Sequence, residues 1–428
     1  MGVDADVVPG GARLWRSPAV VALTASVTVS QVGTQVTLLA LPFVALVELR
    51  AGALVVGLLT AAAYLPWVLF ALPTGAYVDG LDAAAQRRAL IGCDLLRAAL
   101  LAAVPVLAAT GRLTAASLLG LVLVIGCATV LAEVAAAALV PRVVEAPLLP
   151  RVNGLIEGGG ALAMVVGPAL GGALVASVGA AAALSADAVS FAASALLLLR
   201  LPTRAGAPVA PVVPVQAGAG RGDVLLGGLR FLRRDPVLAP LCLWSVTSNL
   251  ASNAITPAVL TYLIRDVRLT SEALGAVFAV AALGGLAGAL VSARLVARLG
   301  LGRFVAASAV VLAVGVLGVG AVALPPAIGA VAVAWWVGVA YAVTLAGNVS
   351  GNAQIATIRQ HRVPQGQLGR VIAAWRFLGF AGIPIGAVLG GGLTEALGPR
   401  PVLVGACVAF ALTCLLPLTA PVRRFTLP

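Results

Sequence analysis

Lysine is absent from the 428 residues, histidine occurs once, and only 15 residues are acidic. Without lysine the chain cannot form the glycine-rich loop ending in Gly-Lys-Ser/Thr that holds nucleotide phosphates. His361 is expected in a loop in contact with water, and no paired acids or histidine-centred base suited to a membrane enzyme are present. Charged residues make up 10% of the chain and hydrophobic residues 61%, too little polar surface for a water-soluble fold. The sequence therefore predicts that lipid surrounds most of the protein.

Two further absences concern cysteine and targeting. The five cysteines stand singly in or beside apolar stretches, which excludes a disulfide framework and a metal site; they are Cys93, Cys127, Cys242, Cys407 and Cys414. Residues 1–17 carry Asp4 and Asp6 and lack a short apolar core with a small-residue cleavage site, so no cleavable signal peptide is expected. The first apolar helix is expected to target the chain.

Apolar stretches long enough to cross a bilayer recur along the chain. Twelve are found, at residues 19–47, 54–78, 89–110, 115–140, 152–178, 180–201, 237–264, 272–296, 304–324, 328–349, 371–397 and 401–420. The sequence therefore predicts an all-α polytopic membrane protein with twelve transmembrane helices.

The arginines are distributed unevenly between the two sides of the predicted membrane. Twenty of the 27 lie at the termini or in loops that follow even-numbered helices, five lie in the opposite loops, and Arg97 and Arg376 lie inside helices. Because arginine is enriched in cytoplasmic loops, both termini are expected in the cytoplasm and the protein in the cytoplasmic (inner) membrane. A net charge of +12 is also compatible with nucleic-acid binding, but arginines scattered beside helix ends are better explained by orientation, and no nucleic-acid partner is expected.

A stretch of different composition separates two groups of six helices. Residues 202–222 are rich in Pro, Gly, Ala and Val, which predicts a cytoplasmic linker at 202–236 between a six-helix bundle at 1–201 and another at 237–428. Within the linker, Val224–Arg234 alternates apolar and basic residues at helical spacing. This segment is expected either on the inner leaflet or in solvent.

The two halves share a local pattern. Pro168 and Pro384 lie 216 residues apart, and each is followed by a glycine cluster. The spacing indicates an internal repeat, although chance similarity between two glycine-rich apolar helices gives the same pattern. Repeated six-helix halves with a site at their interface are typical of transporters.

Short motifs extend from the first predicted helix to the eleventh. They are Ser30-Gln-Val-Gly-Thr34, Ala40-Leu-Pro42, Gly75-Ala-Tyr-Val-Asp79, Arg87-Arg88, Asp94-Leu-Leu-Arg97, Gly167-Pro-Ala-Leu-Gly-Gly172, Asp187-Ala-Val-Ser-Phe191, Gly228-Leu-Arg-Phe-Leu-Arg233, Leu368-Gly-Arg370 and Ala374-Trp-Arg376. Jointly they resemble the major facilitator superfamily, within it the drug:proton antiporter branch of macrolide-efflux proteins and the enterobactin exporter. The resemblance implies two pseudo-symmetric six-helix halves, the major facilitator fold, in a protein that works as a monomer.

The loop between the second and third helices matches the superfamily's cytoplasmic gate motif. The matching residues, Gly75, Asp79, Arg87, Arg88 and Asp94, are implied to lock the cytoplasmic side when the protein faces outward. Gly80 stands where an arginine usually follows the acid, and the loop is lengthened by residues 82–86, so a weaker lock is expected. An ordinary charged turn is the alternative.

The fifth helix matches a motif associated with antiporters. Its residues are Gly167, Pro168, Gly171 and Gly172, and Ala163 replaces one further glycine. Missing side chains let helices approach closely and proline bends the segment, so structural packing explains the pattern equally well.

Charged residues inside the predicted helices are candidates for proton coupling. Glu133, Glu157 and Arg97 lie at a similar depth, counted at 1.5 Å per residue from their helix ends, and an ion pair of Arg97 with one of the two acids is expected. The acid left over favours the protonated form when buried and is able to carry a proton. The alternative is that an acid merely balances Arg97. Asp187 is a further candidate, with a role in fold stability as its alternative.

Polar side chains gather on helices that line the cavity of the resembled fold. On the seventh helix Asn249 and Asn253 fall on one face at a spacing of four, Gln31, Thr34 and Gln35 lie on the first, and Asn348 lies on the tenth. These are candidate cavity-lining residues, and polar contacts between helices are the alternative. Thr34 stands where relatives often carry an acid, which leaves the preferred substrate charge open.

These observations predict a secondary active transporter that exports a small hydrophobic or amphipathic compound, such as a drug, macrolide or siderophore-like molecule, by proton antiport with alternating access. No cofactor is expected, and ATP is excluded as the direct energy source. The expected partners are the substrate, protons and membrane lipid. An uncoupled facilitator or an importer of the same fold is the nearest alternative, and a polytopic membrane enzyme is more distant.

Overall fold

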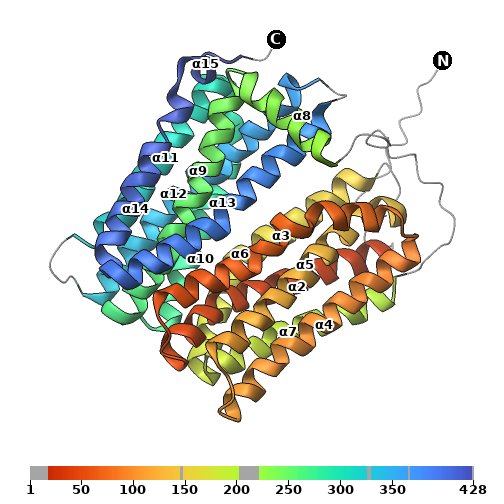
Figure 1. The fold of residues 1–428 in the computed structure, drawn as a ribbon, viewed down its shortest axis with the longest axis vertical. Helices are drawn as coiled ribbons and strands as arrows, with labels where there is room; N and C mark the ends of the chain where they lie inside the picture. Colours follow the sequence, from red (N-terminus) through yellow and green to blue (C-terminus); the bar gives the residue numbers. More distant parts are fainter. Residues whose placement is uncertain (1–17, 145–147, 202–220, 325–328, 365–366, 427–428) are drawn as a thin grey trace, which may run out of the picture.

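The structure is a computed structural model that describes residues 18–144, 148–201, 221–324, 329–364 and 367–426, and every long element in this part is an α-helix. The N-terminal bundle consists of α2 (Pro18–Phe43), α3 (Ala53–Asp79), α4 (Ala83–Ala109), α5 (Ala115–Val143), α6 (Leu149–Val178) and α7 (Ala180–Leu199). The C-terminal bundle consists of α9 (Leu238–Thr261), α10 (Ser271–Leu299), α11 (Leu301–Ala321), α12 (Ala330–Arg362), α13 (Leu368–Leu397) and α14 (Pro399–Thr413). The predicted fold class, twelve helices in two six-helix halves, is confirmed (Figure 1).

Eleven spans in the described part are long and apolar enough to cross a membrane. Helix α9 is not among them, because Asn249, Asn253 and several serines and threonines lower its hydropathy. It still packs within its bundle between α13 and α14. A polar helix at this place is tolerated because its polar groups face protein or an aqueous space rather than lipid.

Several helices extend beyond the predicted apolar stretches. Helix α12 continues to Arg362, so His361 lies in its last turn and not in the expected loop; its side chain is exposed. Helix α4 begins at Ala83, with the Asp82 carboxylate accepting a hydrogen bond of 2.6 Å from the Ala85 main-chain N–H. The expected lengthening of the gate loop is therefore wrong, because those residues are the first turns of a capped helix. Hydropathy marks where lipid contact ends, whereas the helix continues into the polar region.

The two halves repeat an unusual detail at the end of their first helices. Helix α2 passes into a π-helical turn, η1 (Val44–Glu48), and α9 into another, η3 (Tyr262–Asp266). Two residues after each turn stands an arginine with positive φ, Arg50 at 51° and Arg268 at 57°. Residues other than glycine rarely adopt a positive φ, so its occurrence at matching places in the two halves supports the internal repeat.

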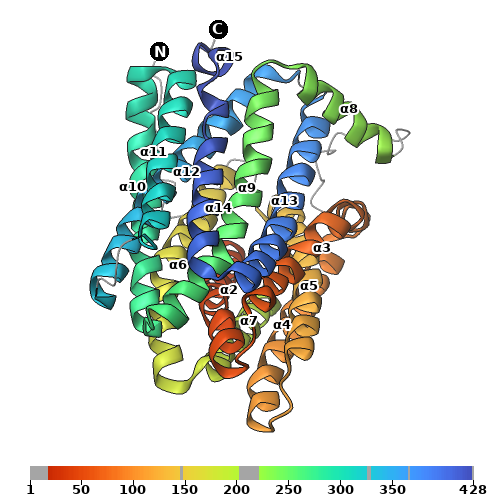
Figure 2. The ribbon, with the colours of Figure 1, turned by 60° about the vertical axis from the view of Figure 1, so that its left-hand side comes forward.

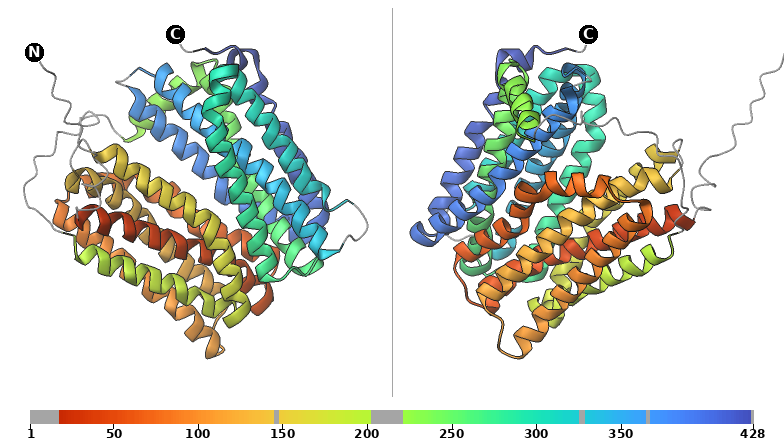
Figure 3. Two further views of the ribbon diagram at one scale, coloured as in Figure 1. Left: turned by 180° about the vertical axis from the view of Figure 1, so that it is seen from behind. Right: turned by 45° about the vertical axis from the view of Figure 1, so that its right-hand side comes forward.

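The bundles meet at one end and diverge toward the end where α2 begins and α15 (Ala420–Arg423) lies (Figures 1 and 3). At the meeting end α3 packs against α13 and α6 against α10. Gly57 of α3 lies directly against the main-chain oxygen of Ala387, and a Cβ on Gly275 of α10 would stand 2.5 Å from the oxygen of Pro168. Glycine allows these backbones to touch. We call this the closed end and the opposite one the open end.

Two charged side chains also cross the closed end. Arg265 donates hydrogen bonds to the main-chain oxygens of Leu46 (3.1 Å) and Ala51 (2.5 Å). Glu395 accepts one of 3.2 Å from the Leu54 N–H in the first turn of α3, where a helix favours negative charge. Both residues belong to the C-terminal half of the chain, and their three partners belong to the N-terminal half.

The predicted linker 202–236 lies partly outside the described residues, which resume with helix α8 (Arg221–Arg234). In Figure 2 this helix lies beside α13 at the open end. Gly228 packs against the main chain of Arg370. The Asp235 carboxylate accepts hydrogen bonds from the Val237 and Leu238 main-chain N–H groups and forms an ion pair of 2.7 Å with Arg362. The segment is therefore tied to the C-terminal bundle.

Candidate functional site

The closed end stops at an aromatic pair. Trp67 of α3 and Phe380 of α13 stack across the two bundles, with ring centroids 5.5 Å apart. Trp67 lies about four turns along α3 from Ala53, which is at the closed end. The stacked rings are therefore a contact between the two bundles, and we take them as the inner boundary of the closed end.

Opposite charges stand beside this boundary, one from each bundle. Arg376 lies one turn before Phe380 on α13, toward the open end, and its side chain is exposed. Glu133 of α5 is exposed as well and interacts electrostatically with Arg376, with Arg97 and with Tyr64 of α3. Because groups from both bundles surround it, Glu133 faces the space between them.

Glu157 reaches the same space from α6. It precedes Pro168 by 11 residues, about three helical turns, so both lie on one face of the helix. At Pro168 this face touches α10, whereas Glu157 lies toward the open end and is exposed. Helical spacing thus places Glu157 on the face of α6 that meets α10, farther toward the open end.

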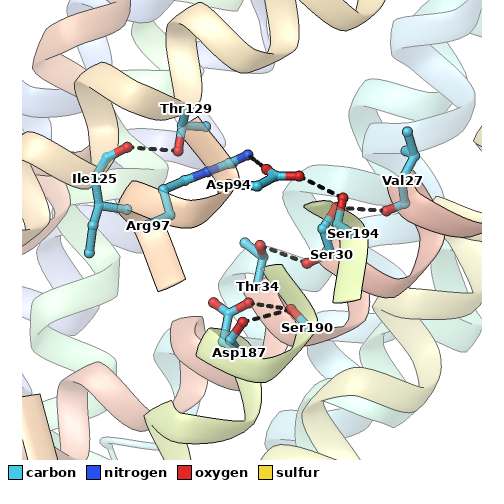
Figure 4. Close-up of polar contacts among 10 residues, drawn as sticks. All are labelled: Val27, Ser30, Thr34, Asp94, Arg97, Ile125, Thr129, Asp187, Ser190 and Ser194. Carbon is cyan, nitrogen blue, oxygen red and sulfur yellow. Dashed lines mark hydrogen bonds and ion pairs between the residues drawn. The ribbon is translucent and has the colours of Figure 1, made fainter. Parts of the chain in front are cut away.

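Arg97 does not pair with Glu133 or Glu157 as expected; its ion pair is with Asp94 of the same helix (Figure 4). The two residues are three positions apart on α4, and this spacing places an acid nearer than any on a neighbouring helix. Ser194 of α7 donates a hydrogen bond of 2.7 Å to Asp94, and the Arg97 guanidinium lies 4.1 Å from the ring centre of Phe191. With 2% of Asp94 and 8% of Arg97 exposed, the pair is an internal contact of the N-terminal bundle.

Asp187 is buried in the same bundle, with 1% of its surface exposed. Its carboxylate accepts hydrogen bonds from the hydroxyls of Thr37 (2.5 Å) and Ser190 (2.9 Å), between α7 and α2. These two hydrogen bonds satisfy the Asp187 carboxylate inside the bundle. The candidate charges thus differ in exposure: Asp94, Arg97 and Asp187 are buried, whereas Glu133, Glu157 and Arg376 are exposed. Glu133 connects the two sets, because it interacts electrostatically with Arg97.

The polar residues of α2 have different surroundings. Thr34 is exposed and its hydroxyl donates to the Ser30 main-chain oxygen at 2.9 Å (Figure 4). Gln31 and Gln35 face α6, where Gly160 and Gly167 leave room for them. The Gln31 side-chain oxygen is buried without a hydrogen-bond partner in the described part of the chain.

On α9 and α12 the amides are partly engaged. Asn249 donates to the Gly379 main-chain oxygen of α13 at 3.2 Å, and Asn253 donates to the Asn249 main-chain oxygen at 2.8 Å. Asn348 accepts from Asn352 at 3.1 Å within α12. Asn249 thus connects two helices, and the half-buried side chains leave acceptor positions open.

The gate-motif residues do not form one cluster in this structure. They are Gly75, Asp79, Arg87, Arg88 and Asp94, and the last is buried with Arg97. Arg87 donates to the main-chain oxygens of Leu198 (2.8 Å) and Leu199 (2.6 Å) and so completes the end of α7. Asp79 and Arg88 are exposed at the open end and make no ion pair within the described residues.

The motif in α6 provides two packing faces. Gly167 and Gly171 lie against Gln35 and Val36 of α2, inside the bundle. Pro168 and Gly172 lie against α10 of the other bundle, and a Cβ on Gly172 would stand 2.5 Å from the Ser271 main-chain oxygen. The motif therefore holds α6 between its own bundle and the closed end.

The positive side of the site was not assigned from the sequence. The sequence places Arg376 inside a helix and in the Ala374-Trp-Arg376 motif without a role at the site, and Arg359 of α12 lies beyond the apolar stretch that is predicted to end at residue 349. In the structure Arg359 lies 5.1 Å from the ring centre of Trp375 and interacts electrostatically with Arg376. The available signal was that α13 carries an arginine within an apolar stretch, which requires a partner or water.

Two six-helix bundles related by an internal repeat, with opposite charges where they part, define a secondary transporter of the major facilitator fold. A family model described as transmembrane secretion effector matches residues 15–427. The chain belongs to this family of membrane transporters and is not an enzyme.

The chain is similar to the multidrug efflux pump Tap of Mycolicibacterium fortuitum, with 29% identity over 398 residues that cover 90% of each chain. It is 28% identical over 277 residues to the enterobactin exporter EntS of Citrobacter koseri, covering 62% of this chain and 60% of that one. A bacterial homologue of the iron transporter ferroportin in its inward-facing state has the same fold, with a TM-score of 0.70, 17% identity and coverage of 95% and 98%. A bacterial ferroportin homologue in the outward-facing state matches with a lower TM-score, 0.60.

Proposed function

We propose that this protein exports a small hydrophobic or amphipathic compound in exchange for protons, by alternating access between its two bundles. The names of its relatives, a multidrug efflux pump and an enterobactin exporter, support export of this class of compound. The site supports it too, since the aromatic pair Trp67 and Phe380 offers an apolar surface beside charges of both signs.

Both termini face the cytoplasm in this proposal. The arginine excess on their side of the membrane supports the orientation. The open end then faces the cytoplasm, from which substrate reaches Glu133, Glu157 and Arg376. The chain works as a monomer, because both bundles that form the site belong to one chain.

The observation that carries the proposal is that Glu133 interacts electrostatically with Arg376 of the other bundle as well as, more strongly, with Arg97 of its own bundle. A charged Glu133 attracts an arginine of the other bundle, and a proton on Glu133 removes that attraction. Proton binding at this carboxylate therefore changes the energy of bringing the bundles together at the open end. Glu157, exposed on α6, is a second proton acceptor in the same space.

The remaining candidates are given supporting roles. Asp79, Gly75 and Arg88 engage when the open end closes, since Asp79 and Arg88 are exposed there now and Gly75 is partly exposed. The glycines and proline of α6 are the surface on which the bundles rock. Asp94, Arg97 and Asp187 hold the N-terminal bundle together.

The test is substrate-driven proton movement in proteoliposomes. A panel of dyes and antibiotics, compared in cells with and without the protein, first supplies a transported probe. We expect Glu133→Gln to lower proton movement coupled to that probe at least about tenfold, because glutamine carries no proton. Exchange of labelled for unlabelled probe across the membrane should continue. This separates loss of coupling from loss of folding.

Glu157→Gln tests the second acid in the same assay. The matched control is Glu272→Gln, an exposed acid in the first turn of α10 that should leave coupling unchanged. Unchanged coupling in both Glu133→Gln and Glu157→Gln would refute the assignment of the proton to these acids. Probe flux that stays the same when the proton gradient is reversed would identify an uncoupled facilitator.

A further inference from the structure

A cavity of about 340 Å³ opens on the outer side of the C-terminal bundle, between α10 and α12 near the closed end. Its walls are apolar and include Val277 and Val280 of α10 and Ala334, Trp335 and Gly338 of α12. Val277 and Val280 lie on the opposite side of α10 from Gly275, which faces the N-terminal bundle. The cavity is therefore separate from the site between the bundles.

The membrane-facing position of this cavity follows from its rim. Trp335 is 64% exposed and Val331, also at the rim, is 73% exposed. Exposed apolar side chains on a membrane-spanning helix contact acyl chains, and the gap between them is open to the same molecules. An acyl chain is thus the apolar partner that reaches the cavity.

One charged residue lines the cavity, Arg268 at the closed end of α10. Its side chain is exposed, and it makes no ion pair within the described residues. Asp266, two residues earlier, interacts instead with Arg400 at 3.8 Å. The guanidinium stands at the level where the apolar span ends, which is the level of lipid headgroups.

We propose that this cavity binds an anionic phospholipid, with one acyl chain between α10 and α12 and the phosphate on Arg268. Apolar walls with a single positive group at the headgroup end match the two parts of such a lipid. A zwitterionic lipid enters the same cavity but gains less from Arg268.

The experiment uses the full chain in nanodiscs and reads quenching of Trp335 by brominated acyl chains, taken as the difference between wild type and Trp335→Phe. Brominated phosphatidylglycerol is titrated into phosphatidylcholine, and brominated phosphatidylcholine into phosphatidylglycerol. We expect phosphatidylglycerol to be preferred about fivefold, the effect of one arginine on an anionic headgroup. Arg268→Gln should bring the ratio to about one while quenching by both lipids continues.

Two variants separate charge from shape. Gly338→Leu adds a side chain at the cavity wall, where its Cβ would stand at an ordinary contact distance of 3.6 Å from Val277 and Val280, and should lower quenching by both lipids. Arg50→Gln is the matched control, with the same charge and the same left-handed conformation in the other half, and should keep the fivefold ratio.

Three results would overturn the proposal. Equal affinity of wild type for the two lipids would exclude headgroup recognition by Arg268. A preference that survives Arg268→Gln would place the headgroup site elsewhere. Displacement of phosphatidylglycerol by glycerol 3-phosphate at equal concentration would identify a phosphate site instead of a lipid site.

Discussion

Asp94→Ala is expected to destabilise the N-terminal bundle by about 3–5 kcal/mol, because it leaves the buried charge of Arg97 without its partner. The remaining interactions of Arg97, with the Phe191 ring and with Glu133, do not replace a direct ion pair, and its Nε already lacks a hydrogen bond in the described part of the chain. The loss should be measured as free energy of unfolding by denaturant titration of the purified protein in detergent micelles.

Companion variants identify the cause of the loss. Asp94→Leu combined with Arg97→Met removes both charges and should destabilise less than Asp94→Ala alone. Asp266→Ala breaks an exposed ion pair and should change stability by less than about 1 kcal/mol. A double variant as unstable as Asp94→Ala would show that packing, and not the stranded charge, sets the loss.

The sequence predicted the helices well because lipid contact demands long apolar runs with few charges. It was less informative about helix ends. Arg359 and His361 belong to α12 because the helix continues after lipid contact ends. The segment that contains them is polar, so hydropathy alone does not assign it to the helix. At α4 the capping residue Asp82 before the first turn is the better signal, and the predicted lengthening of the loop overlooked it.

The sequence predicted how deep in the membrane the charged residues lie, but not which neighbouring helix each of them faces. Glu133 and Glu157 were found because intramembrane acids are rare; both are exposed, and Glu133 interacts electrostatically with Arg376 of the other bundle. The predicted ion pair of Arg97 with one of these acids is wrong, because Arg97 pairs with Asp94. Helices that are apolar on all sides do not reveal which face meets which neighbour. The i,i+3 spacing of Asp94 and Arg97 was the local signal that outweighed similarity of depth.

Adding one methyl group at each of two glycines of the closed end is expected to push the bundles apart there. In Gly57→Ala with Gly275→Ala, each new Cβ overlaps a main-chain oxygen of the other bundle, of Ala387 or of Pro168. Overpacking costs about 1–3 kcal/mol per site, so the pair should shift the balance between the two bundle arrangements by at least about 30-fold. Spin labels on the exposed Val47 and Leu397, one in each bundle, should report a longer distance.

The control replaces Gly92 and Gly120 by alanine, where an added Cβ meets nothing within 4 Å, and should leave the distance unchanged. The closed end also depends on Arg265 and Glu395, whose hydrogen bonds to Leu46, Ala51 and Leu54 must break as the backbones separate. Polar contacts tolerate a small shift by bending, whereas a methyl group against a carbonyl oxygen does not, so the glycines should have the larger effect. If the label distance in the Gly57 and Gly275 double variant matches the control, the polar contacts and not the backbone contact hold the bundles together at this end.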